Sequence, residues 1–185
     1  MARKTPLSGN TDVLVDANIF IAVGKPSNPR FVQFRRAVQQ AGVVLQLPQR
    51  VIGEIGGRDT DRVQTALTEG WAEIIDAPDP TDGDAIAASD IARRTIATVT
   101  GTPEHTVEKA DTILAGLAVQ YATDRSTAGV IVLTDDKPAR AGIQNAVTAQ
   151  GFAGTIEVYG LADIMEVTRL KPRPSGRGYS RQLLF

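Results

Sequence analysis

The chain has 185 residues, of which 42% are hydrophobic and 22% charged, with a formal net charge of −1 and no cysteine. This balance is typical of one globular domain, and without cysteine the chain has no disulfides, zinc–thiolate sites or thiol nucleophiles, which makes an intracellular setting the simpler expectation. It also lacks a signal-like apolar segment near its start and any apolar run of about 18 residues, so we expect a cytoplasmic protein with no membrane contact.

The first predicted strand is the apolar run Val13-Leu14-Val15, which ends directly in Asp16. An apolar run without polar alternation is typical of a central parallel strand that has helices on both faces. In open α/β sheets the ligand crevice lies outside the carboxyl ends of the strands, so Asp16 is a candidate site residue. The alternative is that Asp16 only caps the following helix, which we predict over Ala17–Val23.

The remaining elements alternate along the chain. Strands are expected over 43–47, 71–75, 130–133 and 154–159, the second of these with the alternation of a strand near a sheet edge. Helices are expected over 30–41, 49–55, 61–69, 84–99, 103–123 and 138–150, with a last helical turn over 161–167. This order predicts one α/β domain with a largely parallel sheet over residues 11–168.

Acidic residues follow the second strongly buried strand, 130–133, as they follow the first. Asp135 and Asp136 come directly after Leu133-Thr134 and should emerge at the same sheet edge as Asp16. The alternative is that Asp135 and Asp136 are turn residues before the helix that starts at Pro138.

Two further acids lie on predicted helices. In the helix expected over 103–123, Val107 and Leu114 share one side with Asp111, which places Asp111 at the margin of a buried face. A carboxylate there is costly unless it is paired or binds a metal, and an ion pair with Arg140 is the alternative. Glu54 lies among apolar residues in a short helix, with a surface position as its alternative.

Together these carboxylates predict a metal site. Carboxylates that pack closely repel one another, and each raises the pKa of the others unless a cation lies between them. Mg²⁺ takes oxygen ligands and prefers one or two carboxylates together with substrate phosphate. A divalent ion in such a site activates water and binds phosphoryl oxygens, so hydrolysis of a phosphodiester is the expected chemistry.

Four segments in this order resemble the PIN-domain family: Val15-Asp16-Ala17-Asn18-Ile19, Glu54 after a strand and Pro48, Ala110-Asp111-Thr112-Ile113-Leu114-Ala115, and Leu133-Thr134-Asp135-Asp136. The resemblance covers most of residues 11–150. It implies a three-layer α/β/α fold with a parallel sheet of about five strands and an endoribonuclease that depends on Mg²⁺ or Mn²⁺. Many members are VapC-type toxins, which usually dimerise, so the resemblance also implies a toxin with an antitoxin partner and a homodimer.

By position, the resemblance implies that the catalytic acids are Asp16, Glu54, Asp111 and Asp136. Asp135 is a neighbour or substitute of Asp136, because the family shows Thr, any residue, then Asp at this place. The implied metal ligands are Asp16, Asp111 and Asp136. Asn18 and Thr134 are implied to orient the acids.

Charge is distributed unevenly along the chain. All 21 acidic residues lie between Asp12 and Glu166 together with 13 of the 20 Lys and Arg, a balance of −8. Residues 169–185 contain no acid and carry five cations: Arg169, Lys171, Arg173, Arg177 and Arg181. We expect a flexible basic tail that contacts RNA phosphates or a protein partner, with a solubilising role as the alternative.

Several other functions compete with this interpretation. A PIN-fold interaction module without activity, and a PIN nuclease of ribosomal RNA processing, share the same acids, although the latter branch often adds a cysteine zinc module. A haloacid dehalogenase-type phosphotransferase requires an Asp where Asn18 stands, and a phosphate-receiver domain requires acids and a lysine at successive strand ends. Serine–histidine hydrolysis requires His105, the single histidine, which we expect at the surface.

Overall fold

The computed structural model describes residues 6–57, 60–124 and 127–165, so the basic tail and its five cations lie outside the described residues. Five strands form one sheet in the order β3-β2-β1-β4-β5, and every neighbouring pair is parallel. The strands are β1 (Thr11–Val15), β2 (Leu45–Pro48), β3 (Ala72–Ile75), β4 (Gly129–Leu133) and β5 (Ile156–Tyr159). The predicted parallel sheet is therefore confirmed, and β3 is an edge strand as expected.

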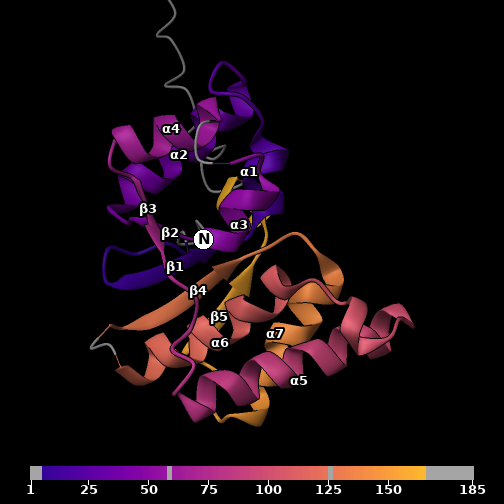
Figure 1. The fold of residues 1–185 in the computed structure, drawn as a ribbon. Coiled ribbons are helices and arrows are strands. Elements are labelled where there is room, and N and C mark those ends of the chain that lie inside the picture. The colour runs from indigo at the N-terminus through magenta and orange to yellow at the C-terminus, as the bar shows by residue number, and fades with distance from the viewer. Residues whose placement is uncertain (1–5, 58–59, 125–126, 166–185) are drawn as a thin grey trace, which may run out of the picture.

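Helices cover both faces of the sheet (Figure 1). On one face lie α1 (Ala17–Val23), α2 (Pro29–Ala41), α3 (Gln49–Glu54), α4 (Asp61–Thr68) and α8 (Leu161–Met165). On the other lie α5 (Gly83–Thr100), α6 (Lys109–Asp124) and α7 (Lys137–Ala149). This arrangement confirms the three-layer α/β/α fold. None of the described helices has the length and apolar character needed to cross a membrane.

The two layers have cores of different composition. Successive residues of a strand point to opposite faces, so Val13 and Val15 join the core beneath α1–α4 while Leu14 joins the core beneath α5–α7. The first core is aromatic, with the ring of Trp71 in contact with three phenylalanine rings. The second is built of small residues, and a Cβ atom at Gly142 would lie only 3.0 Å from the carbonyl oxygen of Ala92. Glycine therefore permits the close approach of α7 to α5.

The helix predicted over 103–123 begins later than expected. A single 3-10 turn, η1 (Glu104–Thr106), is closed by hydrogen bonds from the amide and hydroxyl of Thr106 to the carbonyl of Pro103. Val107 is then extended, with φ −67° and ψ 130°, and α6 starts at Lys109. The prediction that Val107 and Asp111 share one face of a helix is thus wrong, because Val107 precedes α6 and Asp111 lies in its first turn.

The chain order of the strands creates a crevice at the centre of the sheet. From β1 the chain moves outward through β2 to β3, and then returns by α5 and α6 to β4, on the other side of β1. The connections that leave β1 and β4 therefore diverge, and ligands of open α/β sheets bind at such a switch point. The ladder between these strands continues to the site, since the amide of Asp16 donates to the carbonyl of Leu133 over 3.0 Å.

Candidate active site

Asp16 lies at the end of β1 and is only 2% exposed. It occupies the position that caps α1, but its side chain makes no capping hydrogen bond. Instead its Oδ2 accepts one hydrogen bond from the hydroxyl of Thr134 and another from Nδ2 of Asn18, each over 2.6 Å. The structure thus replaces the capping alternative with a carboxylate that is held from two sides.

The Thr134 hydroxyl connects the ends of the two central strands. It donates to Asp16, and it accepts from Nδ2 of Asn18 and from the amide of Asp136, both over 3.1 Å. A hydroxyl has one donor and two acceptor positions, so all of its capacity is used. The amide oxygen of Asn18 also accepts from the amide of Asp135 over 3.0 Å. These bonds fix the turn after β4 against the end of β1, and in them both Asn18 and Thr134 contact the Asp16 carboxylate.

The two acids after Thr134 point in different directions. Asp135 Oδ1 accepts from the amide of Leu161 over 2.9 Å, so this carboxylate is bound to the start of α8. Asp136 caps α7 through Oδ1, which accepts from the amide of Ala139 over 2.7 Å. The charge of Asp136 nevertheless acts on Asp16. The geometry therefore supports Asp136, and not Asp135, as the acid of this strand end.

Asp111 is the most strongly perturbed acid among the described residues. Burial, followed by the negative charges of Asp16 and Asp136 and then of two glutamates, raises the pKa of Asp111 to about 7. The pKa of Asp16 is also raised, first by its own burial, despite the hydrogen bond from Thr134 that lowers it. Arg140 donates to the carbonyl of Thr134 and not to Asp111. The alternative of an ion pair between Asp111 and Arg140 is therefore not found among the described residues.

Two glutamates complete the acidic site. Burial raises the pKa of Glu54 on α3, and the charges of Glu108 and Asp16 raise it further. Glu108 immediately precedes α6, and its charge also acts on Asp111. Sequence reasoning missed Glu108, because the helix was predicted to start at residue 103. The signal that could have found it is its place three residues before Asp111.

The donor set suits a hard divalent cation. Every group in it offers carboxylate oxygen, and the mutual repulsion that raises the pKa of Asp111 is what a cation would relieve. Within residues 6–57, 60–124 and 127–165, no three acids or histidines are close enough to hold an ion by themselves. This spacing still fits Mg²⁺, which is usually bound by one or two carboxylates together with waters and substrate phosphate. Such an ion would be held by Asp16, Asp111 or Asp136.

Comparison with known proteins agrees with this arrangement. A family model described as the halobacterial PIN domain matches residues 9–171, which is most of the chain and includes every acid discussed above. No curated protein is similar enough to the chain to count as a match. The match confirms the predicted PIN-domain family and does not extend to the VapC-type toxins. A parallel five-stranded sheet with acids at its switch point, and a family match over most of the chain, show that this protein belongs to the halobacterial PIN domain family, which has a nuclease fold.

Proposed function

We propose that the protein is an endoribonuclease that depends on a divalent metal ion and hydrolyses RNA phosphodiesters. The observation that carries this proposal is the electrostatic coupling of Asp16, Asp111 and Asp136 at the switch point of the sheet. Neither Asp16 nor Asp111 forms an ion pair with a described residue, and acids whose pKa is raised by burial and by neighbouring acids are typical of sites that bind cations. The PIN-domain membership supports the same reaction class.

Each residue of the site has its own role in the proposed reaction. Mg²⁺ or Mn²⁺ would be held by one or two of Asp16, Asp111 and Asp136 together with waters and substrate phosphate, and it would supply Lewis acidity and positive charge for phosphodiester hydrolysis. Thr134 and Asn18 hold the Asp16 carboxylate in one orientation. Glu54 and Glu108 lie beside these acids, and their carboxylates extend the negative charge toward α3. They are suited to accept a proton from an attacking water.

The biological setting proposed here is that of a toxin paired with an antitoxin, acting in the cytoplasm as a homodimer. The support is the likeness of the four acid-bearing segments to the PIN-domain family, many members of which are VapC-type toxins, together with the basic residues 169–185. Growth arrest on induced expression, relieved by the adjacent gene's product, tests the toxin role, and sedimentation tests the dimer. Ribosomal RNA cleavage at one position without arrest would favour an RNA-processing nuclease instead.

The experiment that tests the activity is cleavage of a labelled RNA by purified protein with Mg²⁺, with Mn²⁺ and with EDTA. Asp16→Asn keeps the shape of the side chain and removes its charge, so we expect cleavage to be lost while the fold is retained. Asp76→Asn is the matched control, because Asp76 is exposed and lies after β3, away from the switch point. Absence of cleavage by the wild type, with no ion binding by calorimetry, would overturn the proposal in favour of a non-catalytic PIN-fold module.

A further inference from the structure

The turn after β4 contains two acids, and the proposed reaction uses only one of them, Asp136. The other, Asp135, is exposed, yet its main chain and its side chain both form hydrogen bonds. Its amide donates to Oδ1 of Asn18 over 3.0 Å, and its own Oδ1 accepts from the amide of Leu161 over 2.9 Å. Asp135 therefore connects the start of α1, next to the acidic site, with the start of α8.

A second side chain holds the residue before Asp135. Nη2 of Arg140, on α7, donates to the carbonyl of Thr134 over 3.0 Å, and the Thr134 amide donates to the carbonyl of Tyr159 over 2.9 Å. The main chain of Thr134 is thus bonded both to the last residue of β5 and to α7. Together with the bond from Asp135 to α8, these contacts attach the turn of residues 134–136 to the carboxyl end of β5.

Gly160 provides the space in which these two side chains meet. A Cβ atom at this position would lie 2.5 Å from Oδ1 of Asp135 and 2.9 Å from Nη2 of Arg140, and both distances are too short for nonbonded atoms. Gly160 is not among the glycines with positive φ, so it does not adopt the left-handed backbone conformation that favours glycine. What this position requires is therefore the absence of a side chain.

The turn is important because it carries two groups of the acidic site. Asp136 is its last residue, and the amide of Asp136 donates to the hydroxyl of Thr134. The same hydroxyl donates to the carboxylate of Asp16. A displacement of the turn would therefore move Asp136 and release Asp16, whichever of the two binds the ion. A misplacement of about 1 Å in a catalytic site costs on the order of 100-fold in rate.

We propose that Asp135, Arg140 and Gly160 form a positioning cluster that holds the turn of residues 134–136, and with it Asp136, against the carboxyl end of β5. This inference rests on the proposed metal-dependent endoribonuclease function, and it gives Asp135 a role other than metal binding. The three are positioning residues, because they act on the site through Thr134 and Asp136. A purely structural role would instead lower the stability of the fold and leave ion binding by the folded protein unchanged.

Ion binding by the RNA-free protein tests Asp135, because it does not require cleavage. In calorimetry with Mn²⁺, Asp135→Ala should bind the ion about tenfold more weakly, which is the scale of losses when contacts that orient metal ligands are removed. Asp135→Asn should bind it nearly as tightly as wild type, since an Asn oxygen can still accept from the amide of Leu161. Equal losses in both variants would assign the effect to charge alone and overturn the proposal.

The matched control removes a carboxylate from the same end of α8. Oδ2 of Asp163 accepts from the amide of Gly160 over 2.8 Å, so Asp163→Ala deletes a similar bond that does not reach the turn. We expect Asp163→Ala to bind Mn²⁺ like wild type, even if both alanine variants melt at a lower temperature. Asp135→Ala that binds the ion as tightly as Asp163→Ala would contradict the positioning role.

Gly160→Ala tests the space between the two side chains. The added methyl group should displace the carboxylate of Asp135 and the guanidinium of Arg140, and thereby weaken Mn²⁺ binding about tenfold. Because both changes act on the same contact, the double variant Gly160→Ala/Asp135→Ala should lose little more than Gly160→Ala alone. Gly83→Ala is the control, since a Cβ atom at Gly83 would meet nothing within 4 Å. Additive losses in the double variant would contradict a shared cluster.

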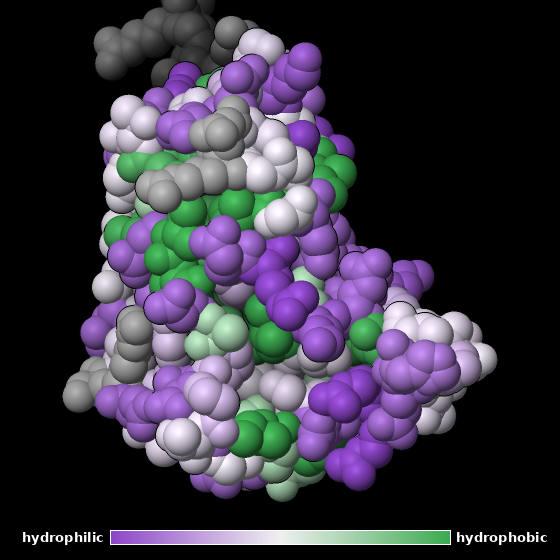
Figure 2. Space-filling view, viewed as in Figure 1, coloured by the Kyte–Doolittle hydropathy of each residue, from purple (hydrophilic) through white to green (hydrophobic). Residues whose placement is uncertain are grey.

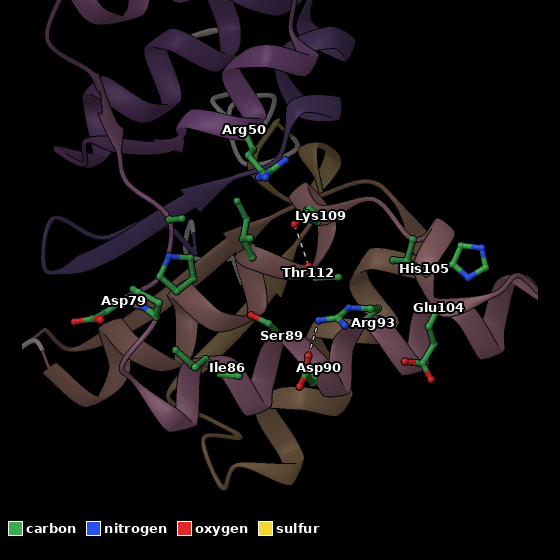
Figure 3. Close-up of a pocket in the computed structure, with 16 residues that line it drawn as sticks. Arg50, Asp79, Ile86, Ser89, Asp90, Arg93, Glu104, His105, Lys109 and Thr112 are labelled. Atoms are coloured by element: carbon green, nitrogen blue, oxygen red, sulfur yellow. Dashed lines mark hydrogen bonds and ion pairs between the residues drawn. The ribbon is translucent and has the colours of Figure 1, made fainter.

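Arg140 is tested by a change whose charge effect has the opposite sign. Loss of a cation near acids would by charge alone tighten ion binding, whereas loss of the bond to the Thr134 carbonyl should weaken it in Arg140→Ala. The control is Arg93→Ala, because Arg93 on α5 pairs with Asp90 in a cavity of about 630 Å³ whose lining includes none of the cluster residues (Figure 3). In Figure 2 the surface is hollowed between the upper helices and the lower helical layer, where this cavity lies. Equal or tighter binding by Arg140→Ala would overturn the proposal.

Ion binding and cleavage together separate the failure of this inference from that of the proposed function. If wild type cuts RNA and the cluster variants bind Mn²⁺ as wild type does, the positioning cluster is wrong and the nuclease function stands. If wild type binds Mn²⁺ and cuts no RNA, with binding weakened in the cluster variants, the proposed activity is wrong and the cluster stands. A wild type that binds no ion would contradict both.

Discussion

The hydroxyl of Thr134 donates a hydrogen bond of 2.6 Å to Oδ2 of Asp16, although the two residues are 118 positions apart in the sequence. This bond joins the ends of β1 and β4, and it is the point at which the acids of the two strands are brought together. The same hydroxyl accepts from Asn18 and from the amide of Asp136. Its loss therefore removes one hydrogen bond from each of these three groups, although Asp16 and Asn18 remain bonded to each other.

Thr134→Val should destabilise the fold and impair cleavage. The variant keeps the branched shape but removes the hydroxyl, and the loss of hydrogen bonds to polar groups in a buried site costs about 1–3 kcal/mol. Loss of an orienting contact to a metal-binding carboxylate typically lowers activity about 10- to 100-fold. Thr148→Val is the control, because Thr148 is exposed and its hydroxyl bonds to the carbonyl of Gln144 within α7. Denaturant unfolding and cleavage rates measure both effects, and wild-type values for Thr134→Val would contradict the role assigned to the hydroxyl.

Asp135 and Asp136 give a matched pair of adjacent substitutions. Asp136→Asn should abolish metal-dependent cleavage without unfolding the protein, since an Asn amide oxygen can still cap α7 at Ala139. Asp135→Asn should retain most activity, because its carboxylate is bound to Leu161 at the start of α8. Cleavage rates and melting curves of the two variants provide the comparison. The reverse result would transfer the catalytic assignment to Asp135.

The stability of the metal-free protein should fall as pH rises. The pKa of Asp111 is about 7 in the fold and 3.8 as the ordinary value, so the folded state binds this proton more tightly than the unfolded chain. The free energy of unfolding therefore decreases from about pH 4 to about pH 7 and then levels off. Asp111→Asn should flatten this decrease and be more stable than wild type at pH 8. Thermal melts in EDTA across this pH range measure the decrease in stability. An equally steep decrease in Asp111→Asn would exclude Asp111 as the source of the pH dependence.

Glu108 should contribute to the site although it is absent from the sequence-based set of acids. Glu108→Gln removes one of the charges that raise the pKa of Asp111 and of Glu54, so both should ionise at lower pH. Carboxyl chemical shifts followed by NMR titration report these values directly. Glu73→Gln, on exposed edge strand β3, provides the control. Identical titrations in the two variants would show that Glu108 lies too far from the site to act.

Removal of residues 171–185 should weaken RNA binding and reduce its salt dependence. The deleted segment carries four of the five tail cations, and each phosphate contact that is lost lowers the slope of log K against log salt by about 0.7 for single strands. Binding titrations at several KCl concentrations give this slope. A truncated protein that binds RNA like the full chain, but no longer binds an antitoxin, would assign the tail to a protein partner.

The strand ends were predictable because their signal is local. Buried apolar runs ending in Asp16 and in Thr134-Asp135-Asp136 define the central parallel strands, and the sheet geometry brings such ends together. The choice between the last two acids was only partly predictable, since it depends on whether a carboxylate meets the amide of Leu161 or that of Ala139. The cap at Ala139 is local, but the bond to Leu161 depends on how α8 docks, which no short segment encodes.

The start of α6 was not predictable from helix propensity. Residues 104–106 do form a helical turn, but the hydrogen bonds of Thr106 to Pro103 close it as a separate 3-10 turn. The extended Val107 then redirects the chain, so Glu108 and Asp111 enter the site from the beginning of a helix.

The crossover that places β4 beside β1 also sets when a growing chain acquires its site. A ribosome that has made β1 and Asp16 must add well over a hundred residues before Thr134 and Asp136 exist. Until β4 pairs with β1, Asp16 lacks its threonine donor, so a partly synthesised chain has neither Asp136 nor the bond that orients Asp16. The protein is proposed to cut RNA, and this order of synthesis means that its site is incomplete while the messenger and the ribosomal RNA surround the nascent chain.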